Sequence, residues 1–196
     1  MRCPVTGNSR QRIVLFDTET TGFPRTPIDK QPDDVQPYIL QLHAVLIEHD
    51  GQEYEVVETL SSYISGAPFI AKSLTDIHGI SMETIQGQPP WSDIREQFFD
   101  MCLRSGHVGA HNFEFDARMV QIEEKRLGYG RPFQGVKHRC SLLKSRRINK
   151  DARSHNLGRL YKHLFNEDMA NAHTADGDVA GLIRVYMDLV SKGAWS

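Results

Sequence analysis

The sequence predicts an α/β domain in which a mixed sheet carries helices on its faces. Residues 13–16 (IVLF) form a short apolar run with β-branched and aromatic side chains, which is typical of a strand covered on both sides. Strand patterns over residues 38–47 and 54–61 flank the hairpin signal Asp50-Gly51, so the chain opens with an antiparallel meander. Mostly helical patterns follow, and we therefore expect helices packed against this sheet.

Proline and serine positions divide the next part of the chain. Residues 23–37 contain four prolines and no apolar period, which indicates a loop. Ser73 is the expected cap of a short helix, and Ser81 the cap of a further turn. After another break at two prolines, we expect Ser92 to open a helix that turns three side chains inward: Ile94, Phe98 and Met101.

Short strands and helices alternate in the second half. Residues 107–111 and 136–140 are expected to be short strands, the first leading through Asn112 into a helix and the second into a basic helix around residues 142–143. Asn156 is the expected cap of another helix. The last helix is the clearest, because its apolar residues follow the i, i+3, i+4, i+7 pattern: Val179, Leu182, Ile183, Tyr186, Leu189 and Val190.

Length and composition predict one globular domain. The chain has 196 residues, 39% of them hydrophobic and 24% charged, and we place a single domain over residues 13–196 after an N-terminal extension, residues 1–12. No apolar run approaches the ~20 residues of a membrane span, and the start lacks the apolar segment of a secretory signal. The three cysteines lie far apart, which suits a reducing compartment. We therefore expect an intracellular protein without a membrane partner.

Charge is distributed unevenly along the chain. The net charge is −2, yet residues 131–163 contain ten lysines and arginines and a single acid, Asp151. A basic segment in an otherwise acidic protein often marks a polyanionic partner. A solvated helix face with a loop is the alternative, and the count alone does not separate the two.

Asp17 and Glu19 directly follow the first predicted strand. On an extended backbone, residues two apart leave the same face, so the two carboxylates lie side by side. Neighbouring carboxylates repel each other unless a cation lies between them, and oxygen ligands suit Mg²⁺ or Mn²⁺. The pair therefore indicates a metal site, while two solvated residues beside a turn remain the alternative.

Two further acidic groups lie at predicted helix starts. Asp116 follows Asn112 in the first turn after a strand, and His173 precedes Asp178 at the start of the final helix. Acids in a first turn also complement the helix dipole, by a few tenths of a kcal/mol to ~1 kcal/mol, and a single histidine is more often an ordinary loop residue. Taken one at a time, these residues do not identify a site.

The order and spacing of these groups resemble the DEDDh branch of the 3′-to-5′ exonucleases. This is the family of the proofreading epsilon subunit of bacterial DNA polymerase III, ribonuclease T and oligoribonuclease. The resemblance runs over residues 13–189. Lesser shared features are DTETTG at 17–22, DIHGI at 76–80, AHN at 110–112, HNL at 155–157 and the AHxA that contains His173.

The resemblance implies an RNase H-like fold with a five-stranded mixed sheet and a metal-dependent site. Asp17, Glu19, Asp116 and Asp178 would hold two divalent ions, Mg²⁺ or Mn²⁺, and His173 would be the general base. Two such ions about 3.5–4 Å apart can serve an in-line displacement at phosphorus. A histidine suits the base role because its unperturbed pKa of about 6.5 lies near neutrality. We expect His173 to be mobile and to become ordered on substrate binding.

Substrate contacts are also implied by the resemblance. They would come from the residues after the first acidic pair, from the second and third motifs and from the basic helix: Thr20, Thr21, His78, Asn112, Phe115, Arg146 and Arg147, with Lys150 and Arg153 as further cations. Stacking on an aromatic side chain tolerates any base and is worth ~1–3 kcal/mol. Plain core packing is the alternative for Phe115.

The expected activity is removal of nucleoside 5′-monophosphates from 3′ ends of single strands, with DNA favoured over RNA. A silent nucleic-acid-binding module on the same fold is one alternative, but such a module would not need the five catalytic residues. A polymerase-docking subunit is another. The chain ends at Ser196, soon after the last predicted helix, which favours a free-standing enzyme. A polymerase or a second copy of the chain remains a possible partner.

Overall fold

The computed structural model describes residues 10–130 and 132–195. A five-stranded mixed sheet with the strand order β3-β2-β1-β4-β5 forms its centre, which confirms the predicted fold class. The strands are β1 (Gln11–Thr20), β2 (Ile39–His49), β3 (Tyr54–Tyr63), β4 (His107–Ala110) and β5 (Lys137–Cys140). β1, β2 and β3 pair antiparallel as the predicted meander, and β4 and β5 extend the sheet in parallel with β1. Residues 1–9 of the expected extension lie outside the described residues.

β1 separates two hydrophobic cores. Val14 and Phe16 face one core and Ile13 and Leu15 the other, so all four side chains of the apolar run are buried. This is the pattern of a central strand, because successive side chains leave opposite faces. The two carboxylates at the end of β1 are therefore carried by the central strand of the sheet.

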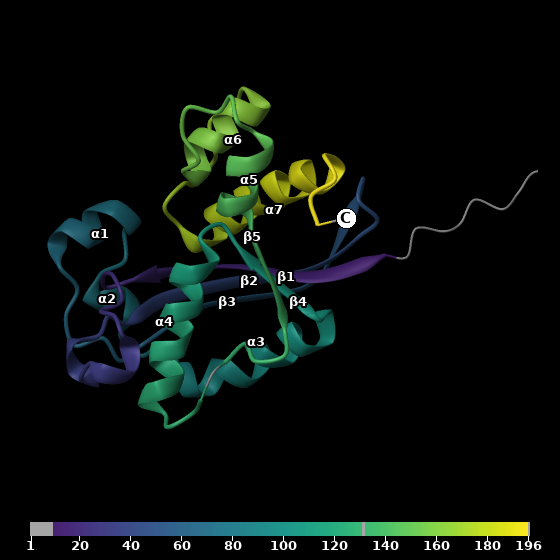
Figure 1. Ribbon diagram of the computed structural model, residues 1–196. Coiled ribbons are helices and arrows are strands. Elements are labelled where there is room, and N and C mark those ends of the chain that lie inside the picture. The colour runs from purple at the N-terminus through teal and green to yellow at the C-terminus, as the bar shows by residue number, and fades with distance from the viewer. Residues whose placement is uncertain (1–9, 131, 196) are drawn as a thin grey trace, which may run out of the picture.

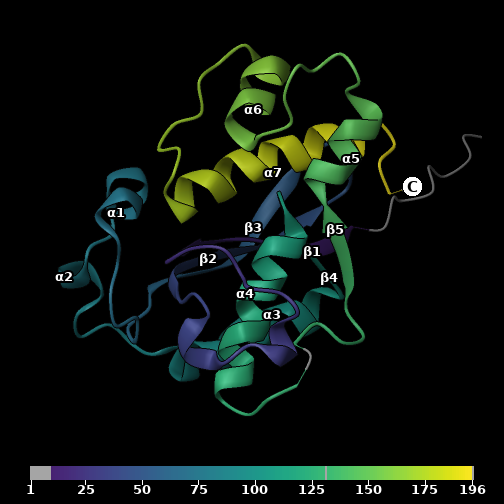
Figure 2. The same ribbon diagram turned by 60° about the vertical axis from the view of Figure 1, so that its left-hand side comes forward.

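Helices cover both faces of the sheet (Figures 1 and 2). α3 (Trp91–Ser105) and α4 (Phe113–Arg126) pack on the face of Phe16, while α7 (Ala175–Ser191) packs on the face of Leu15 and is covered in turn by α5 (Ser141–Ile148) and α6 (Leu157–Phe165). α1 (Lys72–His78) and α2 (Met82–Ile85) lie at one end of the sheet. The expected loop 23–37 contains two short 3₁₀ turns, η1 (Ile28–Lys30) and η2 (Asp33–Val35).

Two predicted helix caps are wrong and two are confirmed. The first helix begins at Lys72 rather than after Ser73, and α3 begins at Trp91 with Pro90 in the cap position instead of Ser92. Ser81 and Asn156 cap their helices through their side chains, as expected.

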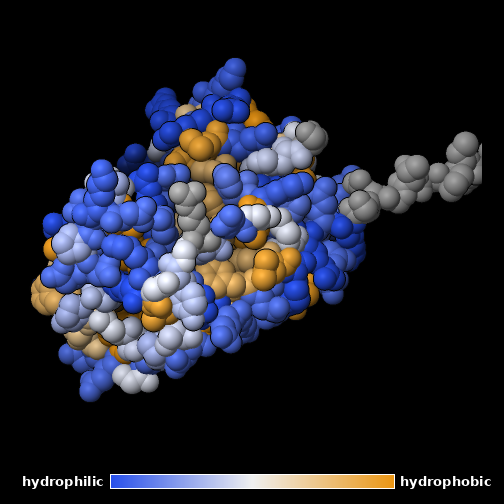
Figure 3. Space-filling model, turned by 60° about the horizontal axis from the view of Figure 1, so that its bottom comes forward, coloured by the Kyte–Doolittle hydropathy of each residue, from blue (hydrophilic) through white to orange (hydrophobic). Residues whose placement is uncertain are grey.

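Figure 3 shows the face that lies at the bottom of Figure 1. This face is mostly hydrophilic, with hydrophobic residues gathered in a band across its middle. Within residues 10–130 and 132–195, no helix combines the length and the apolar character that a membrane crossing requires.

Candidate active site

Asp17 and Glu19 lie near the C-terminal end of β1. Both side chains are half-buried, whereas Phe16, Thr18 and Thr20 on either side of them are buried. The carboxylates therefore leave one face of the strand together, as their spacing predicts. The pairing of β1 with β2 shifts register between Glu19 and Thr20, so the regular ladder ends directly beyond the pair.

Asp178 reaches the same place from the first turn of α7. Thr174 caps this helix by accepting a hydrogen bond from the N–H of Gly177, at 3.2 Å. The N–H of Ala175 donates to the side-chain oxygen of Gln41 on β2, at 3.4 Å, which ties the helix start to the sheet. One oxygen each of Asp17, Glu19 and Asp178 lies within 4.8 Å of the others, so three carboxylates form one group.

Asp116 approaches from the first turn of α4, at the end of the strand that runs parallel to β1. Its Oδ1 accepts hydrogen bonds from the N–H of Thr18, at 3.2 Å, and from the Thr18 hydroxyl, at 2.8 Å. Parallel strands end at the same edge of a sheet, which is why segments 98 residues apart meet here. Asp116 is buried, and its second oxygen remains outside the hydrogen bonds from Thr18.

His173 lies on the loop that leads into α7. It is exposed and has a φ of 70°, so the helix begins after it, as expected. Two glycines of α7 let this loop pack closely, since a Cβ on Gly177 would lie 2.1 Å from the carbonyl oxygen of Asn171, and one on Gly181 would lie 2.2 Å from the sulfur of Met169. His173, Asp17, Asp116 and Asp178 all line one cavity of about 190 Å³.

The four carboxylates lie close together and are partly or fully shielded from solvent, and this raises their pKa values. Burial, and then the negative charges of the three other carboxylates, raise the pKa of Asp17 well above its ordinary value. Burial and the neighbouring acids raise the pKa of Glu19 to about 8, and burial is the main cause that raises the pKa of Asp116 to about 7. Burial raises the pKa of Asp178 to about 6, while nearby His173 opposes the rise. Such a group binds protons or cations.

The donor set fits a hard divalent cation. Asp17, Glu19 and Asp178 offer carboxylate oxygens within 4.8 Å of one another, and Mg²⁺ and Mn²⁺ prefer oxygen ligands. The fourth carboxylate, Asp116, lies outside this three-membered group but lines the same cavity. A cation here would relieve the repulsion that raises the pKa values.

Of the seven predicted substrate contacts, two line the cavity, Asn112 and Phe115. The other five, all among the residues that the structure describes, do not: Thr20, Thr21, His78, Arg146 and Arg147. The Thr20 hydroxyl donates to the carbonyl oxygen of Gly22, and the Thr21 hydroxyl accepts from the N–H of Tyr38, so both hydroxyls serve the turn after β1. His78 is buried in α1, where its Nδ1 accepts from the N–H of Ile80.

A buried histidine, His111, also lines the cavity. His111 donates from Nε2 to the carbonyl oxygen of His155, at 2.7 Å, because a carbonyl can only accept. Its Nδ1 therefore accepts from the Ser141 hydroxyl, at 2.9 Å. Burial lowers the pKa of His111 to about 4, and the charge of Arg146 contributes to this shift. Arg146 and Arg147 are exposed on α5, and neither lines the cavity.

Sequence reasoning missed several residues that build the site. Thr18 orients Asp116, and Gln41 anchors the start of α7, but neither residue type signals such a role by itself. Phe23 is 84% exposed, and its ring meets that of Phe115 edge-on at 5.7 Å, which extends the aromatic wall of the cavity. The signal for Phe23 in the sequence was the presence of an aromatic residue directly after the DTETTG motif.

Comparison with known proteins identifies the family. A family model described as Exonuclease matches residues 14–186. The chain is similar to the 3′-5′ exonuclease DinG of Bacillus subtilis (strain 168), with 28% identity over 185 residues that cover 94% of this chain and 18% of DinG. The chain thus spans less than a fifth of that relative.

Two solved structures share the fold. One, described as 3′-end specific recognition of histone mRNA stem-loop by 3′-exonuclease, superposes with a TM-score of 0.74 at 12% identity, covering 95% of this chain and 84% of the other. The other is E. coli Exonuclease I in complex with a dT13 oligonucleotide, with a TM-score of 0.70 at 15% identity, covering 91% and 41%. The chain belongs to the exonuclease family and has an RNase H-like fold.

Proposed function

We propose that this protein is a 3′-to-5′ exonuclease that releases nucleoside 5′-monophosphates from the ends of single strands. The observation that carries the proposal is the convergence of Asp17, Asp116, Asp178 and His173 on one cavity, with Glu19 in contact range of two of the acids. These residues come from three segments that are far apart in the sequence. Membership of the exonuclease family adds support from outside the site.

The four carboxylates would hold two divalent ions, Mg²⁺ or Mn²⁺. When bound, these ions supply charge neutralisation at the phosphodiester and activation of water. Asp17 is the central carboxylate of the group, because the charges of Asp116, Asp178 and Glu19 all raise its pKa. Thr18 fixes the orientation of Asp116, and Gln41 fixes the start of α7 that carries Asp178.

His173 is the proposed general base. Its imidazole would accept a proton from the attacking water, a role worth typically 10²- to 10⁴-fold in rate. The position suits this role, because His173 is exposed at the cavity and influences the charge of Asp178. The mobility of His173 stays a prediction.

The 3′-terminal nucleotide would lie against the aromatic wall formed by Phe115 and Phe23, with Asn112 beside it. Arg146 and Arg147 would contact phosphates upstream of the terminal bond. The Thr20 hydroxyl is engaged as a donor in the turn after β1, whereas the Thr21 hydroxyl only accepts there and would donate to the substrate. Single-stranded DNA is the first candidate substrate, in keeping with the relative solved on a dT13 oligonucleotide, and RNA the second.

A degradation series tests the activity. Single- and double-stranded DNA and RNA, each labelled at the 5′ end, are incubated with and without magnesium. We expect a ladder that shortens from the 3′ end, fastest on single strands, with nucleoside 5′-monophosphate as the product. Early release of a labelled mononucleotide from the 5′ end would contradict the polarity, and equal activity in excess chelator would refute the dependence on metal.

Replacing His173 by alanine should lower kcat by about 10²- to 10⁴-fold, because the attacking water loses its base. Substrate affinity should change little, since the carboxylates and the aromatic wall remain. Steady-state kinetics on a single-stranded oligonucleotide give both values. His163→Ala is the matched control: His163 is on α6 and pairs with Asp151, so this variant should keep wild-type rates. The assignment is wrong if His173→Ala retains more than a tenth of kcat.

A further inference from the structure

The outward face of α5 is spanned from edge to edge by basic residues. Ser141 and Ser145 are buried and define the inward face of this helix. At 100° per residue, the side chains that follow one another across the outward face are those of Arg146, Leu143, Arg147 and Lys144. Leu143, near the middle of this face, is 56% exposed, which places an apolar side chain among the cations.

In the part of the chain that the structure describes, these cations have no acidic partners, unlike most cations that precede them. Within the described residues, no carboxylate forms an ion pair with Lys137, Lys144, Arg146 or Arg147. Among the described residues before Lys137, most lysines and arginines do form an ion pair with a carboxylate, as Lys72 does with Asp76. A row of unpaired cations repels itself, and this repulsion is relieved by a polyanion.

One edge of this helix borders the proposed catalytic cavity. His111 lines the cavity and shares a hydrogen bond of 2.9 Å with Ser141 of α5, and the charge of Arg146 on the same helix lowers the pKa of His111. Ser145 shares a hydrogen bond of 3.0 Å with His155, which directly precedes the cavity residues 156–158. A strand that leaves the cavity on this side therefore meets α5 first.

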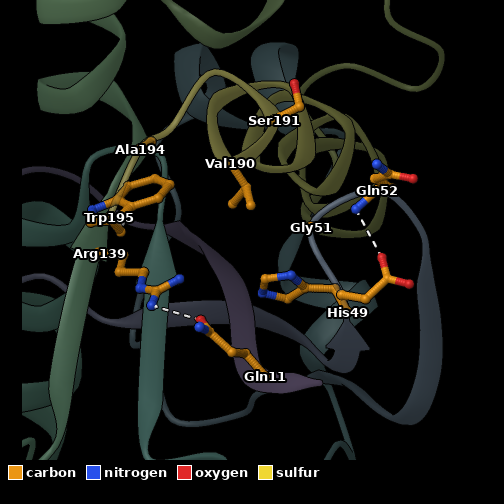
Figure 4. Close-up of a pocket in the computed structure, with 10 residues that line it drawn as sticks. Gln11, His49, Gly51, Gln52, Arg139, Val190, Ser191, Ala194 and Trp195 are labelled. Carbon is orange, nitrogen blue, oxygen red and sulfur yellow. Dashed lines mark hydrogen bonds between the residues drawn. The ribbon is translucent and has the colours of Figure 1, made fainter. Parts of the chain in front are cut away.

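The other edge of the helix leads to a pair of adjoining hollows around Trp195. The ammonium of Lys144 lies 5.5 Å from the centre of the Trp195 ring, and the guanidinium of Arg139 lies 5.4 Å from it. Trp195, Arg139 and Gln11 line both hollows, which measure about 510 and 830 Å³, and Lys137 lines the larger one. In Figure 4, Trp195 and Arg139 form one side of the smaller hollow, and Arg139 donates to Gln11.

We propose, building on the exonuclease function above, that the single strand upstream of the 3′ end crosses α5 and reaches these hollows. Its phosphates pass Arg146, Arg147 and Lys144 in turn, and a nucleotide beyond them lies between Trp195 and Lys137. A helix with its side chains is about 10–12 Å across, and stacked nucleotides are about 3.4 Å apart, so roughly three to four nucleotides span the crossing. A dodecamer reaches the hollows and a trimer held in the cavity does not.

The test compares a trimer and a dodecamer of thymidylate as substrates of the Lys137→Gln/Lys144→Gln variant. We expect the KM for the dodecamer to rise about tenfold, with kcat unchanged, and the KM for the trimer to stay within twofold. The salt dependence of binding to the dodecamer should become shallower by about 1.4 in slope, which corresponds to two lost phosphate contacts on a single strand. The control variant Lys72→Gln/Lys162→Gln removes the same charge from two lysines that have acidic partners. It should change the KM of neither substrate.

Trp195 provides an independent variant. Because its ring also stacks on that of Tyr186, at 5.2 Å, thermal melting accompanies each measurement. Trp195→Leu should weaken binding of the dodecamer about fivefold or more. Trp195→Phe should weaken it less than twofold, since phenylalanine preserves an aromatic surface. An unchanged KM for the dodecamer in the double-lysine variant, or an equal rise for the trimer, would overturn the proposed path.

A binding measurement separates this inference from the exonuclease function. If neither oligonucleotide is degraded, the proposed activity fails. Fluorescence anisotropy of the 5′-labelled dodecamer on the Asp17→Asn protein, with and without the double-lysine substitution, still decides the path. Weaker binding by about tenfold in the combined variant supports it, and equal binding contradicts it.

Discussion

Asp17→Asn should abolish hydrolysis and at the same time stabilise the metal-free protein. Asparagine keeps the shape of the side chain but removes the charge that, at the centre of the group, faces the three other carboxylates. Loss of a central ligand should cost several kcal/mol of transition-state stabilisation, on the order of 10³-fold or more in rate. The burial and repulsion that raise the pKa of Asp17 oppose folding with this residue ionised, so their removal raises the melting temperature.

The opposite signs distinguish a functional role from a structural one. A residue that merely supported the fold would lose activity and stability together when it was replaced. Two measurements at pH 8 give the two values. Rates of hydrolysis are measured on a labelled single strand in magnesium, and melting curves are recorded in chelator. Glu114→Gln is the matched control, because Glu114 shares the first turn of α4 with Asp116 but is exposed and pairs with Arg118. A lower melting temperature for Asp17→Asn, or more than 1% residual activity, would refute the assignment.

The positions of the acids could be predicted because they follow from strand and helix ends. Asp17 and Glu19 continue a buried strand, so their shared face follows from the period of two. Asp116 and Asp178 are in the first turns of helices, where the amphipathic pattern locates them. The meander and the final helix were predictable for the same reason, since each has a clear apolar period or turn signal.

The wrong helix caps show where local signals lose to packing. A serine cap is worth ~1 kcal/mol, whereas burial of a large aromatic side chain is worth about 1.5–3 kcal/mol. Trp91 is 4% exposed, and its indole N–H donates to Glu124 at 2.7 Å, so α3 begins one residue before the expected cap, Ser92. The sequence alone does not show which side chain meets the core.

The supporting residues of the site were not predictable because each acts across a long separation in the chain. Thr18 orients an acid 98 residues away, and Gln41 anchors a backbone N–H 134 residues away. Gly177 matters only because the loop of Asn171 packs against it. Threonine, glutamine and glycine are common residue types, and their roles arise from the packing of segments that no local pattern relates.

In the presence of a chelator, the free energy of unfolding should fall as the pH rises from 6.5 to 8.5, and magnesium should reverse this fall. The pKa values of Glu19 and Asp116 are raised to about 8 and about 7, above their ordinary values near 4. The folded protein therefore binds protons that the unfolded chain has already lost, and stability decreases with pH until both groups ionise. Histidines whose pKa is lowered by burial, such as His43, His49 and His111, act against this trend at the low end of the window, because the unfolded chain still binds protons there that the folded protein binds less.

Because Glu19 is half-buried, solvent screening reduces the effect to on the order of 1–2 kcal/mol, or roughly 3–6 °C in melting temperature. Magnesium replaces the protons as the counter-charge, and at 100 times its Kd a site contributes ~2.7 kcal/mol. Melting curves at pH 6.5 and 8.5, in chelator and in magnesium, test both statements. The magnesium shift should be larger at pH 8.5 and smaller in Asp17→Asn. A chelated melting temperature that is flat or rises over this window, or a magnesium shift that is equal at both pH values, would mean that the carboxylates do not form one cation-binding group.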